Sequence, residues 1–309
     1  MNSIEVAILM CTYNGVPFLR EQLNSIKNQT FHNWCLWVSD DGSSDETLEI
    51  LKKWAKEIGQ DRVKILSGPK LGFCQNFLSL TANSDIRADI FFWSDQDDIW
   101  LPKKIERAIN VIKSVDSEKA VLYGGRTILV DRNNQEYGFS PLFNLHPPSL
   151  ENALLQNLAG GNTIAFNQKA RYLITLGLGF PLVSHDWWAY LVICGCGGML
   201  FYDEIPMVRY RQHGRNLIGS NISLSAKLKR FNCLLNKRFK HWVLQNINAL
   251  DYAKPYLTSS NRNLLENFNK LRKSRNFFER YKLLKITNVH CQKFMQSIIL
   301  KIALLLKII

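Results

Sequence analysis

Short apolar runs alternate with amphipathic segments over residues 4–115, and this alternation limits the folds that the chain can adopt. The runs EVAILMCTY and DIFFWSD have the length of buried strands, whereas VPFLREQLNSIKNQ places its apolar residues at helical spacing. Strands that alternate with helices in this way usually form a mostly parallel sheet with helices on both faces. The sequence therefore predicts a doubly wound α/β fold.

Polar clusters follow three of the predicted strands, at residues 12–15, 40–45 and 95–98. Sheets of this class bind their ligands beyond the carboxyl ends of the strands, so we expect the three clusters to line one crevice. The glycine-rich spacing of dinucleotide-binding folds does not follow the first strand, and no Walker A motif occurs. Dinucleotide and P-loop sites are therefore without support.

Three carboxylates, those of Asp95, Asp97 and Asp98, directly follow a strand-like run. A helix N-terminus could use one of them as a cap, but the other two would still repel each other. Mg²⁺ takes oxygen ligands, which it commonly shares with substrate phosphates, and Mn²⁺ suits the same ligands. The cluster thus predicts a divalent-metal site. A second acidic turn, Asp40 and Asp41 before Gly-Ser, is either part of that site or an ordinary solvated turn.

A single carboxylate, Asp186, lies in the aromatic-rich segment SHDWWAYLV. It can cap a helix, or it can act as the general base that takes a proton from a substrate hydroxyl. Trp187 and Trp188 are either core residues or an apolar face for a sugar ring. The later segment RYRQHG gathers cations suited to phosphate around His213.

The charge balance of the chain changes near residue 216. Residues 1–215 carry 21 Lys and Arg against 23 Asp and Glu, whereas residues 216–309 carry 18 against 3. We therefore expect a domain boundary here, with a catalytic domain over residues 1–216 and a basic helical extension over residues 217–309.

The extension contains two segments that combine an apolar helical face with many cations, SLSAKLKRFNCLLNKRFKHWVLQ and NLLENFNKLRKSRNFFERYKLL. It can pack as a helical hairpin on the catalytic domain or on a second subunit, or it can lie on anionic lipid, which we favour. No stretch of about 20 uncharged apolar residues occurs and no signal peptide is recognisable. We expect a cytoplasmic protein, peripheral on the inner face of the cytoplasmic membrane.

In their order, the segments AILMCTYNG, VSDDGSSDET, KLGFCQNF, WSDQDDIWLPKK, HDWWAYLV and VRYRQHG resemble bacterial family 2 glycosyltransferases, nearest to the rhamnosyltransferase-like branch of surface polysaccharide synthesis. The resemblance covers about residues 4–216. It implies a GT-A fold, a nucleotide-sugar donor, a divalent metal and inversion at the anomeric carbon. We expect a nucleotide-sugar half at about 1–115 and an acceptor half at about 116–216. The Q-x-x-R-W motif of processive members does not occur, so we expect transfer of a single sugar.

The resemblance also implies roles for individual residues. Asp186 is expected to be the general base, although many members have Glu before this Asp, where this chain has His185, whose role stays open. Asp97 is expected to ligate Mg²⁺ or Mn²⁺, with His213 as a further metal or phosphate contact. The expected donor-binding residues are Thr12, Tyr13, Asp40, Asp41, Asp95 and Arg211. Trp187 and Trp188 are expected to contact the acceptor.

Together these inferences predict an inverting, metal-dependent glycosyltransferase. The donor would be dTDP-rhamnose or a UDP-hexose, and the acceptor a lipid-linked lipopolysaccharide, O-antigen or capsule glycan. Two alternatives stay open. A nucleic-acid-binding protein would use the basic C-terminal region, yet no nucleic-acid-binding motif accompanies the charge. A nucleotidyltransferase would also use paired carboxylates and Mg²⁺.

Overall fold

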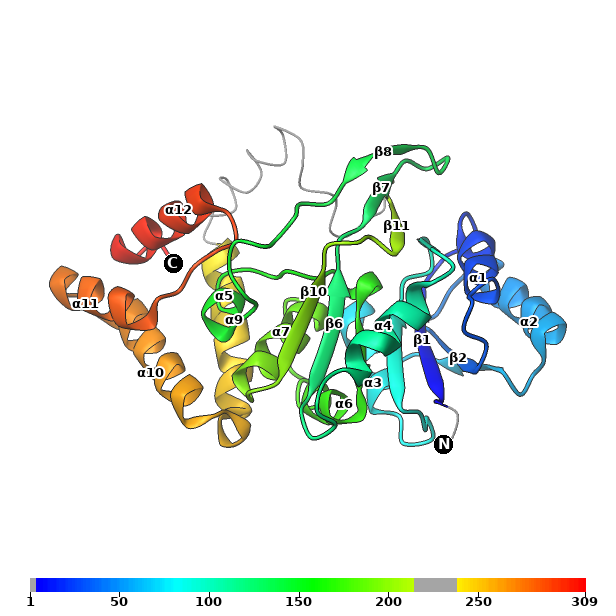
Figure 1. The fold of residues 1–309 in the computed structure, drawn as a ribbon, viewed down its shortest axis with the longest axis horizontal. Coiled ribbons are helices and arrows are strands. Elements are labelled where there is room, and N and C mark those ends of the chain that lie inside the picture. Colours follow the sequence, from blue (N-terminus) through cyan, green and yellow to red (C-terminus); the bar gives the residue numbers. More distant parts are fainter. Residues whose placement is uncertain (1–3, 214–237) are drawn as a thin grey trace.

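A mixed, mostly parallel sheet forms the centre of the molecule in the computed structural model, which describes residues 4–213 and 238–309 (Figure 1). Its strand order is β10-β6-β9-β4-β1-β2-β3, and only β9 runs antiparallel to its neighbours. The strands are β1 (Val6–Thr12), β2 (Trp34–Asp40), β3 (Val63–Ser67), β4 (Ile90–Ser94), β6 (Val121–Gly125), β9 (Ala165–Asn167) and β10 (Met199–Asp203).

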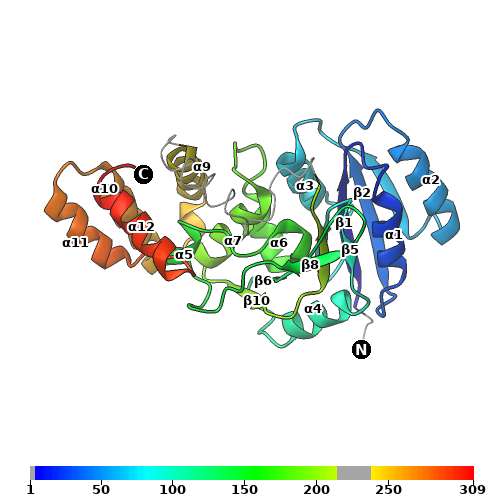
Figure 2. The same cartoon turned by 90° about the horizontal axis from the view of Figure 1, so that it is seen from above.

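Helices cover both faces of this sheet, as the alternating pattern predicted. In β1, Ala7, Leu9 and Cys11 face one core and Val6, Ile8 and Met10 face the other, because successive side chains of a strand point to opposite sides. Figure 2 shows α3 and α4 on opposite sides of the sheet. The first core contains α3 (Phe73–Ala82), α5 (Leu150–Ala153), α6 (Gln168–Thr175) and α7 (His185–Gly195), and the second contains α1 (Leu19–Lys27), α2 (Thr47–Ile58) and α4 (Lys104–Lys113). The doubly wound fold is confirmed.

A second, smaller sheet lies beside the carboxyl edge of the first. Its order is β5-β11-β7-β8, and its strands are β5 (Ile99–Trp100), β7 (Ile128–Val130), β8 (Glu136–Phe139) and β11 (Val208–Arg211). Because β5 begins directly after Asp98 and pairs with β11, this sheet brings the RYRQHG segment to the acidic loop.

The described C-terminal residues form four helices, α9 (Arg238–Tyr252), α10 (Ser259–Lys273), α11 (Phe277–Thr287) and α12 (Phe294–Leu305). Val243, Ile247 and Leu250 of α9 share the core that contains α7. The Asn261 side chain of α10 donates to the carbonyl oxygens of Cys194 and Gly195 at the end of α7. These helices therefore pack on the α/β part of the chain, which is one of the arrangements that the sequence left open.

Two predictions about the extension fall partly on residues 214–237, which lie outside the described ranges. They are the domain boundary at residue 216 and the greater part of the first amphipathic segment. None of the helices in the two described ranges is both long enough and apolar enough to cross a membrane.

Candidate active site

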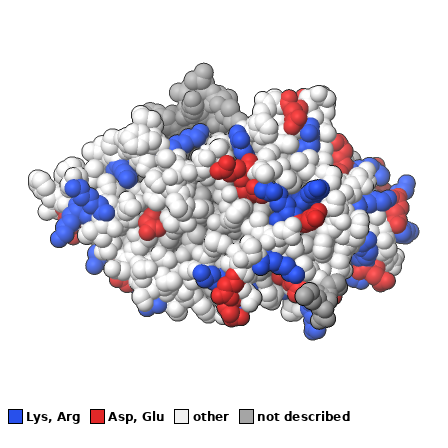
Figure 3. Space-filling view, in the orientation of Figure 1, with Lys and Arg blue, Asp and Glu red and all other residues white. Residues whose placement is uncertain are grey.

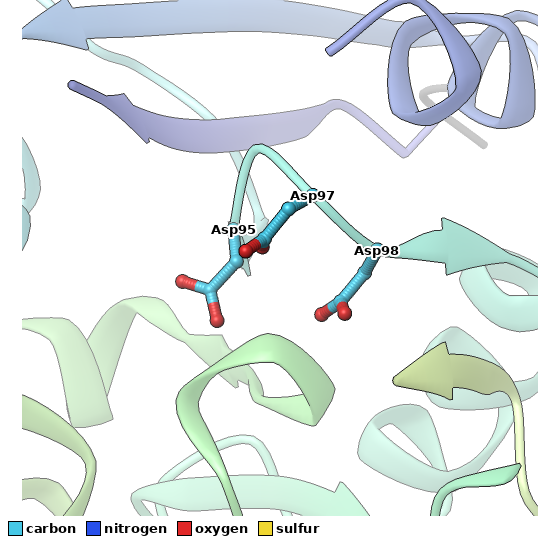
Figure 4. Close-up of side chains that lie close together, drawn as sticks. All are labelled: Asp95, Asp97 and Asp98. Atoms are coloured by element: carbon cyan, nitrogen blue, oxygen red, sulfur yellow. The ribbon is translucent and has the colours of Figure 1, made fainter. Parts of the chain in front are cut away.

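The three polar clusters meet at the carboxyl edge of the sheet, as predicted. Thr12 at the end of β1 is paired in register with Asp40 at the end of β2, and Met10 is paired with Ser94 at the end of β4. The acidic loop therefore starts beside the end of β1. Figure 4 shows the side chains of Asp95, Asp97 and Asp98 gathered on this loop.

The acidic turn after β2 is rigidly hydrogen-bonded. Asp40 is buried and accepts from the Thr12 hydroxyl (2.8 Å), the Ser43 amide (2.8 Å) and the Ser43 hydroxyl (2.6 Å). Asp41 accepts from the amides of Lys70 (2.6 Å) and Gly72 (3.0 Å). Thr12, Asp40 and Asp41 thus fix the turn after β2 and the loop before α3 at the carboxyl edge of the sheet.

Tyr13 is the exposed member of this group, with 59% of its surface accessible. The Gln96 side chain forms two hydrogen bonds with the Tyr13 backbone. It accepts from the Tyr13 amide and donates to the Tyr13 carbonyl, each at 2.9 Å. A Cβ on Gly15 would lie 2.3 Å from Gln96 Oε1, so only glycine leaves room for this contact. Gln96 therefore ties the acidic loop to the end of β1 and leaves the Tyr13 ring free to contact a ligand.

The three carboxylates of the acidic loop have different environments. Asp98 is fully buried and accepts from Asn162 Nδ2 (2.6 Å) and the Arg211 amide (3.1 Å), so its oxygens are already engaged. Asp95 and Asp97 are partly exposed. Burial, followed by repulsion from Asp97 and Asp186, raises the pKa of Asp95 to about 7. Asp186 therefore lies close enough to the acidic loop to interact with it.

A buried lysine lies behind the loop. Lys104 is fully buried, donates from Nζ to the Asn162 carbonyl at 2.7 Å, and lies 3.6 Å from the centroid of the Trp100 ring. Burial lowers the pKa of Lys104 well below its usual value, and the negative charges of Asp98 and Asp95 partly oppose this effect. Lys104, Asn162 and Gln96 were not among the site residues predicted from the sequence. Only Lys104 could have been suspected from the sequence, because Lys103 and Lys104 closely follow the acidic motif. Asn162 comes from a distant segment, so nothing in the sequence indicates its contact with Asp98.

Arg211, expected to bind the donor, has a structural role here. It is fully buried and donates to the Asp97 carbonyl (3.0 Å), the Arg132 carbonyl (2.8 Å) and Glu21 Oε2 (2.9 Å). Its guanidinium also lies 4.6 Å from the centroid of the Phe18 ring. A side chain without exposed surface cannot contact a diphosphate in this conformation, so Arg211 holds the acidic loop in place instead.

His213 and Asp97 are brought together, although 116 positions separate them in the chain. His213 Nε2 lies 2.8 Å from Asp97 Oδ2, and the imidazole stacks on Phe18 with the ring centroids 4.9 Å apart. The structure thus places the two expected metal contacts side by side at the mouth of the acidic loop.

Asp186 occupies the first turn of α7. Its carboxylate accepts from the amides of Gly161 (3.1 Å) and Trp187 (2.7 Å), and little of the residue is exposed. These bonds stabilise the negative charge and orient the group, as expected for a residue at a helix start. Its negative charge helps to raise the pKa of Asp95, so it lies near the acidic loop.

Trp187 and Trp188, expected to contact the acceptor, are core residues. Trp187 is buried and donates to the Ala153 carbonyl (2.7 Å), while Trp188 is fully buried and donates to the Ile174 carbonyl (2.8 Å). All residues of α7 are buried, because the sheet, α5, α6 and α9 surround it. Neither indole has a free face for a sugar ring.

His185 is enclosed by aromatic rings. Its imidazole stacks on Phe77 (centroids 4.2 Å apart) and meets Trp93 edge-on (4.6 Å), and neither ring nitrogen has a hydrogen-bond partner among the described residues. Burial lowers the pKa of His185 to about 4, partly opposed by Asp186. The residue is therefore neutral in the folded protein at pH 7.

Replacing His185 with Leu is expected to reduce the fall in the free energy of unfolding that occurs as the pH is lowered. Between pH 6.5 and 4 the unfolded chain protonates this histidine and the folded chain does not, so the wild type loses up to about 3 kcal/mol as the pH falls through that window. Urea unfolding at several pH values measures the difference between variant and wild type. His32→Leu, at an exposed position, is the control; parallel curves for wild type and His185→Leu would contradict the assignment.

Comparison with known proteins identifies the family. The model described as Glycosyl transferase family 2 matches residues 7–169. The dTDP-rhamnosyl transferase RfbG of Shigella flexneri is 31% identical over 251 residues, which make up 78% of this chain and 84% of that protein. The chain belongs to glycosyl transferase family 2. It is therefore a nucleotide-sugar-dependent glycosyltransferase, as the order of its motifs predicted.

Solved structures of low sequence identity share the fold of this glycosyltransferase. Residues 1–349 of S. aureus TarS in complex with UDP-GlcNAc align with a TM-score of 0.54 at 15% identity, covering 92% of this chain and 89% of that one. The mannosyltransferase PcManGT from Pyrobaculum calidifontis, in complex with GDP-Man and Mn²⁺, aligns with a TM-score of 0.52 at 17% identity, covering 99% and 86%. The GT-A fold prediction is confirmed.

The acidic loop of this glycosyltransferase suits a hard divalent cation. One oxygen from each of Asp95, Asp97 and Asp98 lies within 4.8 Å of the others, so the loop can hold a metal. Because the Asp98 oxygens are already bonded to protein donors, Asp95 and Asp97 are the carboxylates best able to bind one directly. The imidazole of His213 lies against Asp97, with its Nε2 atom 2.8 Å from Asp97 Oδ2.

Proposed function

We propose that this glycosyltransferase moves one sugar from a nucleotide-sugar donor, with inversion and with the help of Mg²⁺ or Mn²⁺, to a hydroxyl of a bacterial surface glycan. The acceptor is a lipopolysaccharide, O-antigen or capsule glycan carried on a lipid. The observation that carries the proposal is the pairing of Asp97 with His213 at the acidic loop of a family 2 chain, with Asp186 close enough to raise the pKa of Asp95. The identity with a dTDP-rhamnosyl transferase supports dTDP-rhamnose as the donor, and a UDP-hexose is the second candidate.

The donor lies along the carboxyl edge of the sheet in this proposal. Tyr13 contacts the nucleotide, and the turn framed by Thr12, Asp40 and Asp41 forms the wall beside it. Asp95, Asp97 and His213 would hold the metal, which when bound neutralises charge on the diphosphate leaving group. The partly exposed positions of Asp95 and Asp97 leave room for donor oxygens to complete the coordination.

Asp186 acts as the general base in this mechanism. Its carboxylate, held by the amides of Gly161 and Trp187, takes the proton of the acceptor hydroxyl while that oxygen bonds to the anomeric carbon. The bond from this carbon to the diphosphate breaks as the new bond forms, through an oxocarbenium-like state. Since the acceptor attacks opposite the leaving group in a single displacement, the anomeric configuration is inverted.

The location of the reaction follows from its acceptor. We place the protein in the cytoplasm, peripheral on the inner face of the cytoplasmic membrane, where a lipid-linked glycan is accessible. The excess of 18 basic over 3 acidic residues in 216–309 supports attraction to an anionic leaflet.

A donor screen tests the proposed function. Incubation with dTDP-rhamnose, UDP-glucose, UDP-galactose and UDP-GlcNAc should give metal-dependent release of nucleoside diphosphate from one or a few donors. Chelation with EDTA should stop the release and added Mn²⁺ should restore it. No release from any donor would favour a nucleic-acid-binding protein. Release of pyrophosphate from nucleoside triphosphates would instead indicate a nucleotidyltransferase.

A further inference from the structure

The outer face of α12 is an apolar stripe. Met295, Ile299, Ile302 and Leu306, at and just beyond the helix, are spaced by 4, 3 and 4 residues and expose 65%, 43%, 50% and 60% of their surfaces. This spacing places them on one side of a helix. The opposite side, with Leu300, Ala303 and Leu304, is buried in the core. A surface helix of a globular protein usually has polar residues on its outer side. The outer side of α12 instead exposes apolar residues to solvent.

The neighbouring helix α11 also exposes aromatic side chains. Phe278 of α11 is 79% exposed, and Tyr281 is about half exposed. Cations lie among these rings, since Lys282 and Lys285 are exposed and the Lys285 ammonium lies 4.6 Å from the centroid of the Tyr281 ring. Residues 274–309 carry seven Lys and Arg against one acidic residue, Glu279. Figure 3 shows this end of the molecule as mostly uncharged surface with Lys and Arg beside it.

The stripe is firmly attached to the catalytic domain. Gln292, just before α12, accepts from the amides of Leu145 (2.9 Å) and His146 (3.1 Å) and donates to the His146 carbonyl (2.6 Å). At the other end of α12, Arg280 Nε donates to the Leu305 carbonyl at 2.8 Å. In Figures 1 and 2, α12 lies at the end of the molecule away from α1 and α2. A partner that binds the stripe is therefore held in a defined position relative to the acidic loop.

We propose that the outer face of α12, together with the exposed Phe278 of α11, docks on the surface of an anionic lipid bilayer. The combination of an apolar stripe with nearby lysines matches such a surface, because apolar side chains enter the headgroup region while ammonium groups attract anionic lipid. A second copy of this chain would bring the same lysines against each other, which disfavours a symmetric dimer on this face. The inference rests on the proposed function for its purpose, since a lipid-linked acceptor would lie at the same surface.

Sedimentation of the full chain with lipid vesicles tests this docking face. Wild type should bind vesicles of phosphatidylglycerol and phosphatidylcholine, and bind pure phosphatidylcholine at least tenfold more weakly. The triple variant Met295→Ser, Ile299→Ser, Ile302→Ser should partition at least tenfold more weakly into the anionic vesicles. The control Ile205→Ser, which removes an apolar side chain exposed by 50% on the β10–β11 loop, should stay within twofold of wild type.

Two further measurements separate the possible outcomes. Unchanged vesicle binding of the triple variant would overturn the proposal, and so would a wild-type dimer in lipid-free buffer that the triple variant converts to monomer. Release of nucleoside diphosphate without acceptor or lipid should be equal in all three proteins. If no protein releases it but the triple variant still loses vesicle binding, the docking face stands and the proposed function fails.

Discussion

The Asp186→Asn variant is expected to transfer sugar about a thousandfold more slowly than wild type and to bind the donor with nearly unchanged affinity. General bases typically contribute 10²- to 10⁴-fold to a rate, and asparagine cannot take the acceptor proton. It can still accept from the Gly161 amide, so the turn at the start of α7 should persist. A transfer assay gives the rate, and calorimetry gives the donor affinity.

Glu151→Gln is a suitable control for Asp186→Asn, because Glu151 is a carboxylate on α5 that interacts with Cys194, at the opposite end of α7 from Asp186. Its transfer rate should stay within about twofold of wild type. Wild-type turnover of Asp186→Asn would remove Asp186 as the base. An equal loss of donor binding and of transfer would assign it to the donor instead.

The second large effect is expected for Asp97→Ala, which should weaken donor binding in the presence of Mn²⁺ by at least about tenfold, the lower range for loss of a metal contact. The free energy of unfolding without metal should not fall, because Asp97 raises the pKa of Asp95 and Asp98 by repulsion and its removal relieves that repulsion. Titration of the nucleotide sugar with Mn²⁺ and with EDTA measures the first quantity, and urea unfolding the second.

Asp85→Ala is the control for Asp97→Ala. Asp85 is exposed before β4, at the end opposite to the acidic loop, and its removal should leave donor binding unchanged. Equal donor affinity of wild type and Asp97→Ala in Mn²⁺ would contradict a role for Asp97 in metal binding.

The meeting of the three polar clusters at one edge of the sheet could be predicted from the sequence, because it depends only on the order and direction of the strands. Once β1, β2 and β4 are neighbouring parallel strands, the polar residues after them must share an edge, and the observed pairing of Thr12 with Asp40 follows this rule. The position of His213 beside Asp97 could be expected only through the family resemblance. It depends on the pairing of β5 with β11, two short strands far apart in the chain.

The roles of Arg211 and the two tryptophans could not be predicted, because burial depends on which elements surround a residue. Arginine is rarely buried, and the burial of Arg211 requires acceptors from Glu21, Asp97 and Arg132, which come from three separate segments. A Trp pair in a helix suits a sugar platform or a core equally well. The packing of α5, α6 and α9 around α7 decides for the core.

The electron paramagnetic resonance of Mn²⁺ tests most directly whether the acidic loop binds a divalent metal. Free Mn²⁺ gives a sharp six-line signal that broadens when the ion binds to a protein. We predict that wild type with the accepted nucleotide sugar removes one equivalent of free Mn²⁺, and that Asp97→Ala leaves it in solution under the same conditions. Donor binding of equal affinity in Mn²⁺ and in EDTA, with no loss of the free Mn²⁺ signal, would contradict metal binding at this loop.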